Sequence, residues 1–169
     1  MGFFHAKSLP SFEKLYEEYQ GMVRHLVFRM VGEEALEDLV QESFLRIWRG
    51  LPKFKGESSL KTWVYRVATN VCLDFLKKQK KLGKELYEIE LGQLNSKLDQ
   101  DLYQQKSLHE GLNTLKEEQR TALILFYWEE LSLKEIAKVL GVALGTVQSR
   151  VFHGRKNLLQ FLKEKGITL

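Results

Sequence analysis

Cysteine and proline are scarce in this chain of 169 residues, and long apolar runs are missing from it. Cys72 is the only cysteine, which excludes an internal disulfide framework and suits a reducing compartment. No apolar run approaches the roughly 20 residues that a membrane-spanning helix needs, and the first residues lack the apolar stretch of a secretory signal. We therefore expect a cytoplasmic protein that is not inserted in a membrane.

A large surplus of one charge is also missing, because the formal net charge is only +4. The charge is instead distributed unevenly along the chain. Residues 46–84 carry 11 Lys or Arg and 2 acids, and residues 131–169 carry 7 and 2, whereas residues 1–45 and 85–130 are net acidic. Two separate basic segments favour two contact surfaces for a polyanion, of which nucleic acid is the commonest. Runs of charge also form ordinary solvated surfaces, so charge alone leaves both interpretations open.

Apolar residues recur every three to four positions over most of the chain, which is the period of an amphipathic helix. No long segment alternates apolar and polar residues, and the two prolines interrupt the chain only at positions 10 and 52. Two stripes are the clearest: Leu36, Leu39, Val40, Ile47 and Trp48, and then Leu60, Val64, Val67, Val71 and Phe75. We therefore predict an all-α protein.

Local signals predict where the helices begin and how they group into domains. We expect helices over about 12–30, 33–49 and 59–79, the third capped by Ser58 or Ser59. Capping-box patterns at residues 114–117 and 132–135 predict two further helix starts. The apolar pattern weakens over residues 81–100. The sequence thus predicts two small helical domains, residues 1–80 and 101–169, joined by a flexible linker over residues 81–100.

Residues 131–162 predict a helix-turn-helix unit. Ser132 caps a short helix, Gly141 supplies the positive φ that a sharp turn needs, and a second helix begins near Leu144. No acid occurs from residue 142 to residue 162, and the polar side of the second helix carries hydrogen-bonding groups, an aromatic ring and a cation. Such a surface favours phosphate contact, with the second helix in the major groove of a duplex. A helix-turn-helix within a purely structural bundle is the alternative.

The helix that starts near residue 59 carries another candidate contact surface beside its apolar stripe. On a helical wheel, Trp63, Arg66, Asn70 and Lys77 lie along one edge. A ring on which bases stack, an amide and two cations are typical of a surface that binds single-stranded nucleic acid. Phe54 precedes this helix in a loop, and Lys78 extends the positive charge. Trp63 is equally compatible with a place at the edge of the core.

Asp38, Gln41 and Glu42 are expected side by side on the exposed face of the second helix. Clustered carboxylates can act as metal ligands or general acids. No histidine occurs at ligand spacing on this helix, and the four histidines of the chain form no metal or catalytic motif. A protein-binding face is the better interpretation, and we expect no enzymatic activity, no metal and no cofactor. Cys72, without a nearby His or second Cys, is expected to be inert in the core.

Two segments together resemble a known family: residues 38–78, DLVQESFLRIWRGLPKFKGESSLKTWVYRVATNVCLDFLKK, and residues 131–158, LSLKEIAKVLGVALGTVQSRVFHGRKNL. In order and spacing they closely resemble the extracytoplasmic-function group of sigma-70 family RNA polymerase sigma factors, over about residues 10–165. The resemblance implies two helical domains, σ2 and σ4, that bind core RNA polymerase through its β′ clamp helices and β subunit and direct it to promoter DNA. It also implies regulation by an anti-sigma factor.

The resemblance implies a role for each candidate surface. Asp38, Gln41 and Glu42 match positions that dock on the β′ clamp helices. Phe54, Val67 and Asn70 match positions that form a pocket for a base flipped from the −10 strand, where stacking and edge contacts offset the loss of base stacking. Together with the helix edge, the expected −10 residues are Phe54, Trp63, Arg66, Val67, Asn70, Lys77 and Lys78. The expected −35 residues are Thr146, Gln148, Ser149, Arg150, Phe152, His153, Arg155 and Lys156.

The chain departs from the family pattern around the expected −35 helix. Ala143 stands where many relatives have Pro or Ser, and Gln148 and His153 stand where they often have basic residues. Gly154 replaces the usual Ala, at a cost of roughly 0.5–1 kcal/mol in helix stability. These departures leave −35 binding itself expected, and they leave open whether the usual −35 sequence is the one that is read.

Two other functions compete with this interpretation. A stand-alone helix-turn-helix regulator would bind duplex DNA without polymerase, and it gives no reason for the edge from Trp63 to Asn70. A nucleic-acid enzyme that holds Mg²⁺ with the carboxylates of residues 33–42 would cleave its substrate in a metal-dependent way. The sequence lacks a second ligand cluster for such a site.

Overall fold

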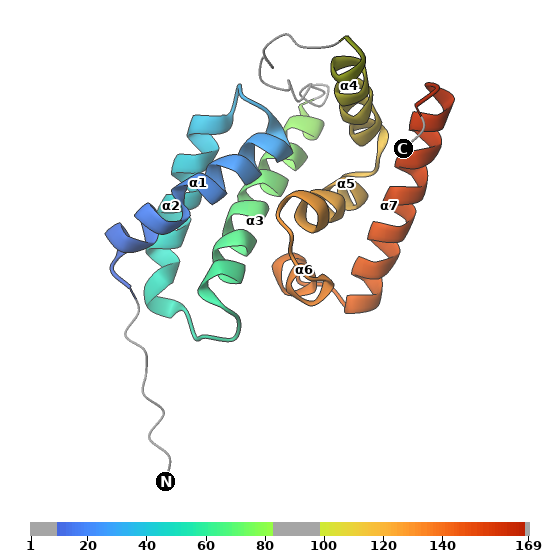
Figure 1. Cartoon of the computed structure of the whole chain (residues 1–169). Coiled ribbons are helices and arrows are strands. Elements are labelled where there is room, and N and C mark those ends of the chain that lie inside the picture. The colour runs from blue at the N-terminus through green and yellow to red at the C-terminus, as the bar shows by residue number, and fades with distance from the viewer. Residues whose placement is uncertain (1–9, 83–98, 168–169) are drawn as a thin grey trace.

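The computed structural model describes residues 10–82 and 99–167, and every regular element in these residues is helical. The α-helices are α1 (Phe12–Val31), α2 (Leu36–Gly50), α3 (Leu60–Lys81), α4 (Asp99–Thr114), α5 (Glu117–Leu123), α6 (Leu133–Leu140) and α7 (Leu144–Glu164). A short 3-10 helix, η1 (Leu51–Lys53), follows α2, and a π-helix, η2 (Ile124–Trp128), follows α5. Figure 1 shows α1 to α3 grouped on one side and α4 to α7 on the other. The prediction of an all-α protein with two helical domains is confirmed.

The helices α1, α2 and α3 form a bundle in which each packs against the other two. Ser11 starts α1, because its hydroxyl accepts a hydrogen bond from the Lys14 N–H at 3.4 Å. Ser59 starts α3 in the same way, accepting from the Thr62 N–H at 3.1 Å, so one of the two expected caps is confirmed. The three helices agree with the predicted ranges to within a few residues.

The helices of the second domain gather around α7, which packs against α4, α5 and α6. The predicted helix start at Thr114 is wrong. Thr114 is the last residue of α4, and its hydroxyl donates to the Gly111 carbonyl at 2.7 Å. The cap of α5 is Lys116, which makes no side-chain bond. Because α4 already holds the preceding residues in a helix, the threonine hydroxyl bonds backward within that helix.

The two domains are in direct contact. One buried apolar cluster runs from α1, α2 and α3 into the second domain, where it includes Ile124, Leu125, Leu131, Ile136, Val139 and Val147. The bridge between the domains is α3, which packs against α6. The sequence predicts two domains and a linker but no such contact. Residues 83–98, which make up most of the predicted linker, lie outside the described residues.

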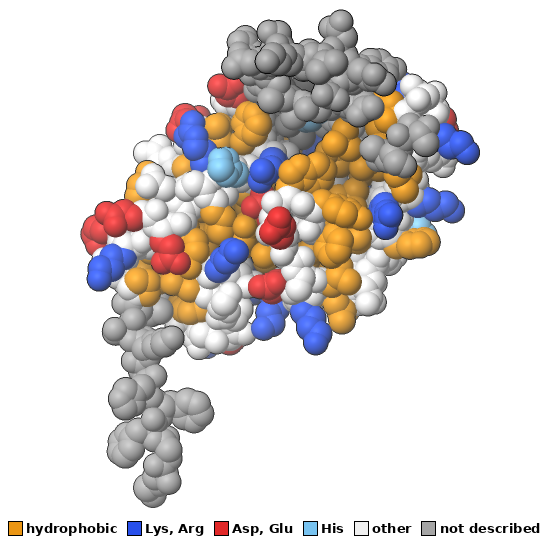
Figure 2. Space-filling model, viewed as in Figure 1, with side chains coloured by type: hydrophobic (Ala, Val, Ile, Leu, Met, Phe, Trp, Pro, Cys, Tyr) orange, Lys and Arg blue, Asp and Glu red, His pale blue; other side chains and the backbone are white. Residues whose placement is uncertain are grey.

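The surface of this assembly carries charges of both signs on the side in view. Figure 2 shows hydrophobic side chains gathered over the middle of that face, with Lys or Arg and Asp or Glu scattered among them. No helix in the described part of the chain has both the length and the apolar character that a membrane crossing demands.

Candidate functional site

The loop before α3 and the first turns of α3 form a pocket with aromatic and cationic walls. Phe54 lies against Trp63, with ring centroids 5.3 Å apart and 48° between the ring planes. The pocket has a volume of about 500 Å³, and its lining consists of Lys53, Phe54, Lys55, Glu57, Ser58, Thr62, Trp63, Arg66, Lys138 and Gly141. Three of the predicted −10 residues, Phe54, Trp63 and Arg66, are thus brought together.

The other predicted −10 residues follow α3 away from this pocket. Val67 is half-buried, whereas Asn70, Lys77 and Lys78 are exposed. None of these residues lines the pocket. At 3.6 residues per turn, Asn70 lies about one turn beyond Arg66 on the same edge of α3. The structure therefore presents these residues as a strip that leads away from the pocket.

Trp63 has both of the roles that the sequence leaves open. The residue is half-buried, and a Cβ added at Gly50 would lie 3.0 Å from its Cζ2 atom, so the ring packs closely on the end of α2. The same residue lines the pocket beside Phe54. One part of the Trp63 side chain thus packs on the end of α2, and another part stays exposed and lines the pocket.

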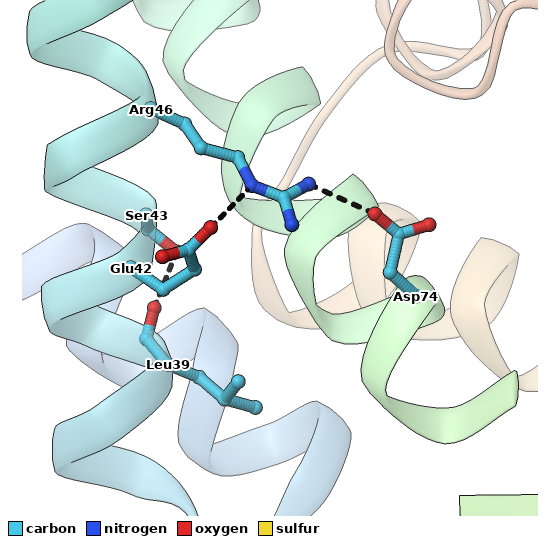
Figure 3. A network of polar contacts seen from close by, with 5 residues as sticks. All are labelled: Leu39, Glu42, Ser43, Arg46 and Asp74. Carbon is cyan, nitrogen blue, oxygen red and sulfur yellow. Dashed lines mark hydrogen bonds and ion pairs between the residues drawn. The ribbon is translucent and has the colours of Figure 1, made fainter. Parts of the chain in front are cut away.

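The predicted protein-binding face lies on α2. Asp38 and Gln41 are exposed, and Glu42 is half-buried. Figure 3 shows Arg46 between two carboxylates: its Nε donates to Glu42 at 2.7 Å and its Nη1 donates to Asp74 of α3 at 2.8 Å. The hydrogen bond to Asp74 raises the pKa of Arg46 most, and the hydrogen bond to Glu42 raises it further. Arg46 therefore links α2 to α3, and this link fixes the position of the Glu42 carboxylate.

Beside this face lies an apolar groove that sequence reasoning missed. It has a volume of about 420 Å³ and is lined by Phe12, Tyr16, Glu37, Val40, Gln41, Phe44, Leu45 and Trp48. Trp48 is 58% exposed, so its predicted place in the buried stripe is wrong. Ile47 is fully buried, and the next residue is rotated by about 100° away from the core. Gln41, Leu45 and Trp48 recur at spacings of four and three, a signal that could have identified the groove.

The helix-turn-helix of α6 and α7 agrees with its prediction. Ser132 and Glu135 form a capping box, in which the serine hydroxyl accepts from the Glu135 N–H at 3.3 Å and the carboxylate accepts from the Ser132 N–H at 2.9 Å. Hydrogen bonding to Ser132 lowers the pKa of Glu135. Gly141 ends α6 in the left-handed conformation, at φ 66 and ψ 34, as the turn requires. Ala143 caps α7 without a side-chain bond.

The outer side of α7 carries the predicted −35 residues. Arg150 is half-buried, and the other members of the set are exposed: Thr146, Gln148, Ser149, Phe152, His153, Arg155 and Lys156. Phe152 is 64% exposed, and its ring makes an edge contact with His153 at 5.2 Å between centroids. The inner side of α7 buries Val147, Gly154 and Leu162. A surface with an uncovered aromatic ring, hydrogen-bonding groups and cations suits contact with a duplex.

Gly154 has a packing role that the sequence does not reveal. The residue is buried against α5, where an added Cβ would lie 3.2 Å from the Cβ of Gln119 and 3.2 Å from the Cγ of Leu123. Both distances are tighter than ordinary van der Waals contact. The glycine therefore permits a close approach of α5 and α7. The packing gained in this way offsets the cost of a glycine within a helix.

Glu129, directly after η2, joins the two domains and was also missed. Its side chain is only 5% exposed. Its carboxylate accepts a hydrogen bond from Arg29 Nη1 of α1 at 2.6 Å and from the Tyr65 hydroxyl of α3 at 2.9 Å. Burial, followed by the charge of Glu129, raises the pKa of Tyr65. Nothing in the sequence distinguishes Glu129 from the neighbouring acids, because its partners are distant along the chain.

The structure gives the competing Mg²⁺ enzyme little support. Glu37 pairs with Arg24, and Glu42 pairs with Arg46, so both carboxylates already have cationic partners. Within residues 10–82 and 99–167, no three His, Cys, Asp or Glu side chains are grouped as metal ligands. Cys72 is fully buried, as expected, and burial raises the pKa of its thiol to about 12.

Comparison with known proteins gives matches to both domains. The family description "Sigma-70 region 2" matches residues 15–82, and "Sigma-70, region 4" matches residues 105–158. The ECF RNA polymerase sigma-E factor of Haemophilus influenzae is 30% identical over 162 residues, which cover 86% of this chain and 84% of that protein. RNA polymerase sigma factor SigV of Bacillus subtilis is 33% identical over 128 residues, covering 75% and 76%.

Two solved structures resemble the whole arrangement of helices. Sigma factor RpoE from Bartonella quintana, in complex with the anti-sigma factor NepR, has a TM-score of 0.71 at 25% identity, covering 90% of this chain and 96% of that chain. CnrH, in complex with the cytosolic domain of CnrY, has a TM-score of 0.66 at 20% identity, covering 90% and 88%, and shares the fold.

Proposed function

Because this chain belongs to the extracytoplasmic-function group of the sigma-70 family of RNA polymerase sigma factors, we propose that its two domains divide promoter recognition between them. The first domain, residues 1–80, docks on core polymerase and binds the −10 strand; the second, residues 101–169, reads the −35 duplex, and residues 81–100 link them. The protein works in the cytoplasm and catalyses no reaction of its own. The observation that carries this division is the pocket of Phe54, Trp63 and Arg66 on α3.

The pocket suits an unstacked base of the −10 strand. Aromatic rings bind such bases at roughly 1–3 kcal/mol each by stacking. Phe54 and Trp63 supply two rings in contact, and Lys53, Lys55 and Arg66 supply positive charge for the neighbouring phosphates. Asn70, exposed one turn beyond Arg66, can hydrogen-bond a base edge. We assign the half-buried Val67 to the strip of α3 between Arg66 and Asn70, beside the pocket, and Lys77 and Lys78 to the backbone of the strand beyond it.

The exposed side of α7 suits a duplex major groove. Gln148, Ser149 and His153 offer hydrogen bonds to base edges, and Phe152 offers apolar contact to a thymine methyl group. Arg155 and Lys156 face outward for phosphate contacts, which fix the orientation of a recognition helix. The set is completed by Thr146 at the start of α7 and by the half-buried Arg150.

The acidic face of α2 and the adjoining groove suit the clamp helices of the β′ subunit. Asp38, Gln41 and the anchored Glu42 supply polar contacts, and Trp48 supplies an exposed aromatic of the kind that dominates many interfaces. The β subunit completes the polymerase contact. The likeness to RpoE bound to its anti-sigma factor NepR supports an anti-sigma factor as a further partner.

Run-off transcription with core polymerase on a fragment library tests the proposal. The protein should create new start sites, whereas a stand-alone helix-turn-helix regulator would bind duplex DNA and create none. Asn70→Ala should impair −10 opening while leaving core affinity intact, and loss of core affinity in this variant would refute the base-pocket assignment.

Glu42→Lys should weaken core binding, because it inverts a charge of the docking face and repels Arg46. Asp74→Asn is the matched control, since it removes the other partner of Arg46 without altering α2. If Glu42→Lys keeps normal core affinity, or if Asp74→Asn loses as much, the docking face is wrongly placed.

A further inference from the structure

The apolar groove on α1 and α2 is lined by aromatic rings, and part of its lining is exposed. The Tyr16 and Phe44 rings lie 4.6 Å apart between centroids, and the Phe12 ring lies 6.4 Å from that of Phe44. At the rim, Leu45 is 40% exposed and Trp48 is 58% exposed. Exposed apolar residues that gather in one place beside polar ones mark an interaction site. The groove is therefore suited to a partner that brings aromatic side chains.

A segment of this same chain is joined directly to the groove. Phe12, the first residue of α1, lines the groove. Residues 1–9, MGFFHAKSL, precede it and lie outside the described residues. Along α2 the groove extends from Glu37 to Trp48, which is roughly 16 Å at 1.5 Å per residue. Seven extended residues span up to roughly 25 Å, so the segment is long enough to reach every part of the groove.

The segment matches the groove in the type and size of its side chains. It contains two adjacent phenylalanines, Phe3 and Phe4. An apolar cavity of roughly 150 Å³ holds one benzene ring. The groove, with a volume of about 420 Å³, therefore has room for both rings.

The charges of the segment and of the groove are opposite. The segment carries one cation, Lys7, and no acid. Residues 33–42, which border the groove, carry five acids and no cation. Arg24 and Arg46 pair with two of these acids, so an acidic surplus remains. Such complementarity favours the segment over a partner of the same charge as the groove.

Attachment to α1 makes even a weak contact effective. A short linker gives an effective concentration in the millimolar range. At roughly 5 mM, a contact whose dissociation constant is about 0.5 mM for the separate segment would be formed in about 90% of molecules. A partner that needs the same groove would then bind with an affinity lower by about tenfold.

We propose that residues 1–9 occupy the groove through Phe3 and Phe4 and thereby compete with core polymerase for the α2 face. The inference rests on the proposed docking function of that face. The competition is intramolecular, so it does not depend on the concentration of the protein. In this respect it differs from the pairing of two copies of the chain through their grooves.

The variant Phe3→Ser/Phe4→Ser tests the competition. The matched control is Ala6→Ser/Ser8→Ala, which changes two residues of the same segment and keeps both phenylalanines. Each protein is the full chain with its tag at the C-terminus, and biolayer interferometry measures its affinity for immobilised core polymerase. The serine variant should bind about tenfold more tightly than the wild type, and the control should match the wild type. An unchanged or lower affinity of the serine variant would overturn the proposal.

A disulfide tests where the segment lies. In Phe4→Cys/Leu45→Cys the second cysteine is in the groove, whereas in the control Phe4→Cys/Lys14→Cys it is exposed on the opposite side of α1 from Phe12. Cys72 is fully buried and does not compete. The groove pair should oxidise at least about tenfold faster than the control, at a rate independent of protein concentration. Equal rates, or a rate that rises with concentration as pairing of two copies requires, would overturn the proposal.

The oxidised groove pair also tests the competition directly. With the segment held in place, the protein should lose its affinity for core polymerase, and reduction with dithiothreitol should restore it. Normal core affinity of the oxidised protein would overturn the proposal even if the serine variant behaved as expected.

One further variant separates this inference from the proposed function. In the Phe3→Ser/Phe4→Ser background, Trp48→Ala should lower the affinity for core polymerase. If it does not, the docking assignment fails, whereas a fast disulfide in the groove still supports the place of the segment. If Trp48→Ala lowers the affinity but the serine variant alone binds as the wild type does, the docking assignment stands and the competition is refuted.

Discussion

Replacing Trp48 with alanine separates polymerase docking from DNA reading. A tryptophan side chain offers up to roughly 250 Å² of contact area. Trp48 is 58% exposed, so about 140 Å² is uncovered, which at roughly 25 cal/mol per Å² gives at most about 3.5 kcal/mol on burial. An interface covers such a side chain incompletely, so we expect a loss of about 2 kcal/mol, or about 30-fold in core polymerase affinity.

Biolayer interferometry with immobilised core polymerase measures this affinity for the wild type and each variant. Phe152→Ala is the matched control, because Phe152 is an aromatic residue of similar exposure, 64%, on the other domain. It should keep core affinity and weaken binding to a −35 duplex, whereas Trp48→Ala should do the reverse. Urea denaturation checks that both variants are folded. An unchanged core affinity for Trp48→Ala, or an equal loss in both variants, would refute the docking role of the groove.

Three further predictions concern stability, its dependence on pH, and thiol reactivity. Ser132→Ala removes the hydroxyl that caps α6 and should lower the free energy of unfolding in urea by about 1 kcal/mol; no change would contradict the cap. Because the capping box lowers the pKa of Glu135, its stabilisation is complete above the ordinary carboxyl pKa and is lost as the pH falls through the lowered value, so Ser132→Ala should lose this acid dependence. Cys72 is buried with a pKa of about 12, so near pH 8 a thiol reagent should react only as fast as the protein unfolds, and faster reaction would contradict this.

Features that depend on local sequence could be predicted well. The period of apolar residues identifies α1, α2 and α3, because each helix buries one continuous stripe against its neighbours. Ser59, Ser132 and Gly141 were identifiable because a cap or a left-handed residue depends on the nearest few positions. The exposure of Asn70 and Phe152 also follows from the wheel, since both lie beside the buried stripe and outside it.

Features that depend on contacts between distant segments could not be predicted. Tyr65 looks like a residue outside the core of its own domain, and it is buried because α6 covers α3 on that side. Glu129 has its partners 100 and 64 positions away, so no spacing rule connects them. Trp48 was misplaced for the opposite reason, because a stripe drawn on one helix does not show where the neighbouring helices stop. The roles of the proposed contact residues remain predictions.

The π-helix η2 makes the length of one segment decisive for the relation between the domains. The Glu129 N–H donates to the Ile124 carbonyl at 3.2 Å, five residues back, and Glu130 then turns with a positive φ of 53°. An ordinary α-helix would bond four residues back, so deleting one residue of η2 would restore that pattern and swing Glu129 by about 100° away from Arg29 and Tyr65. The loss of one residue from η2, without any substitution at the contact itself, would thus break the hydrogen bonds by which Glu129 joins the two domains.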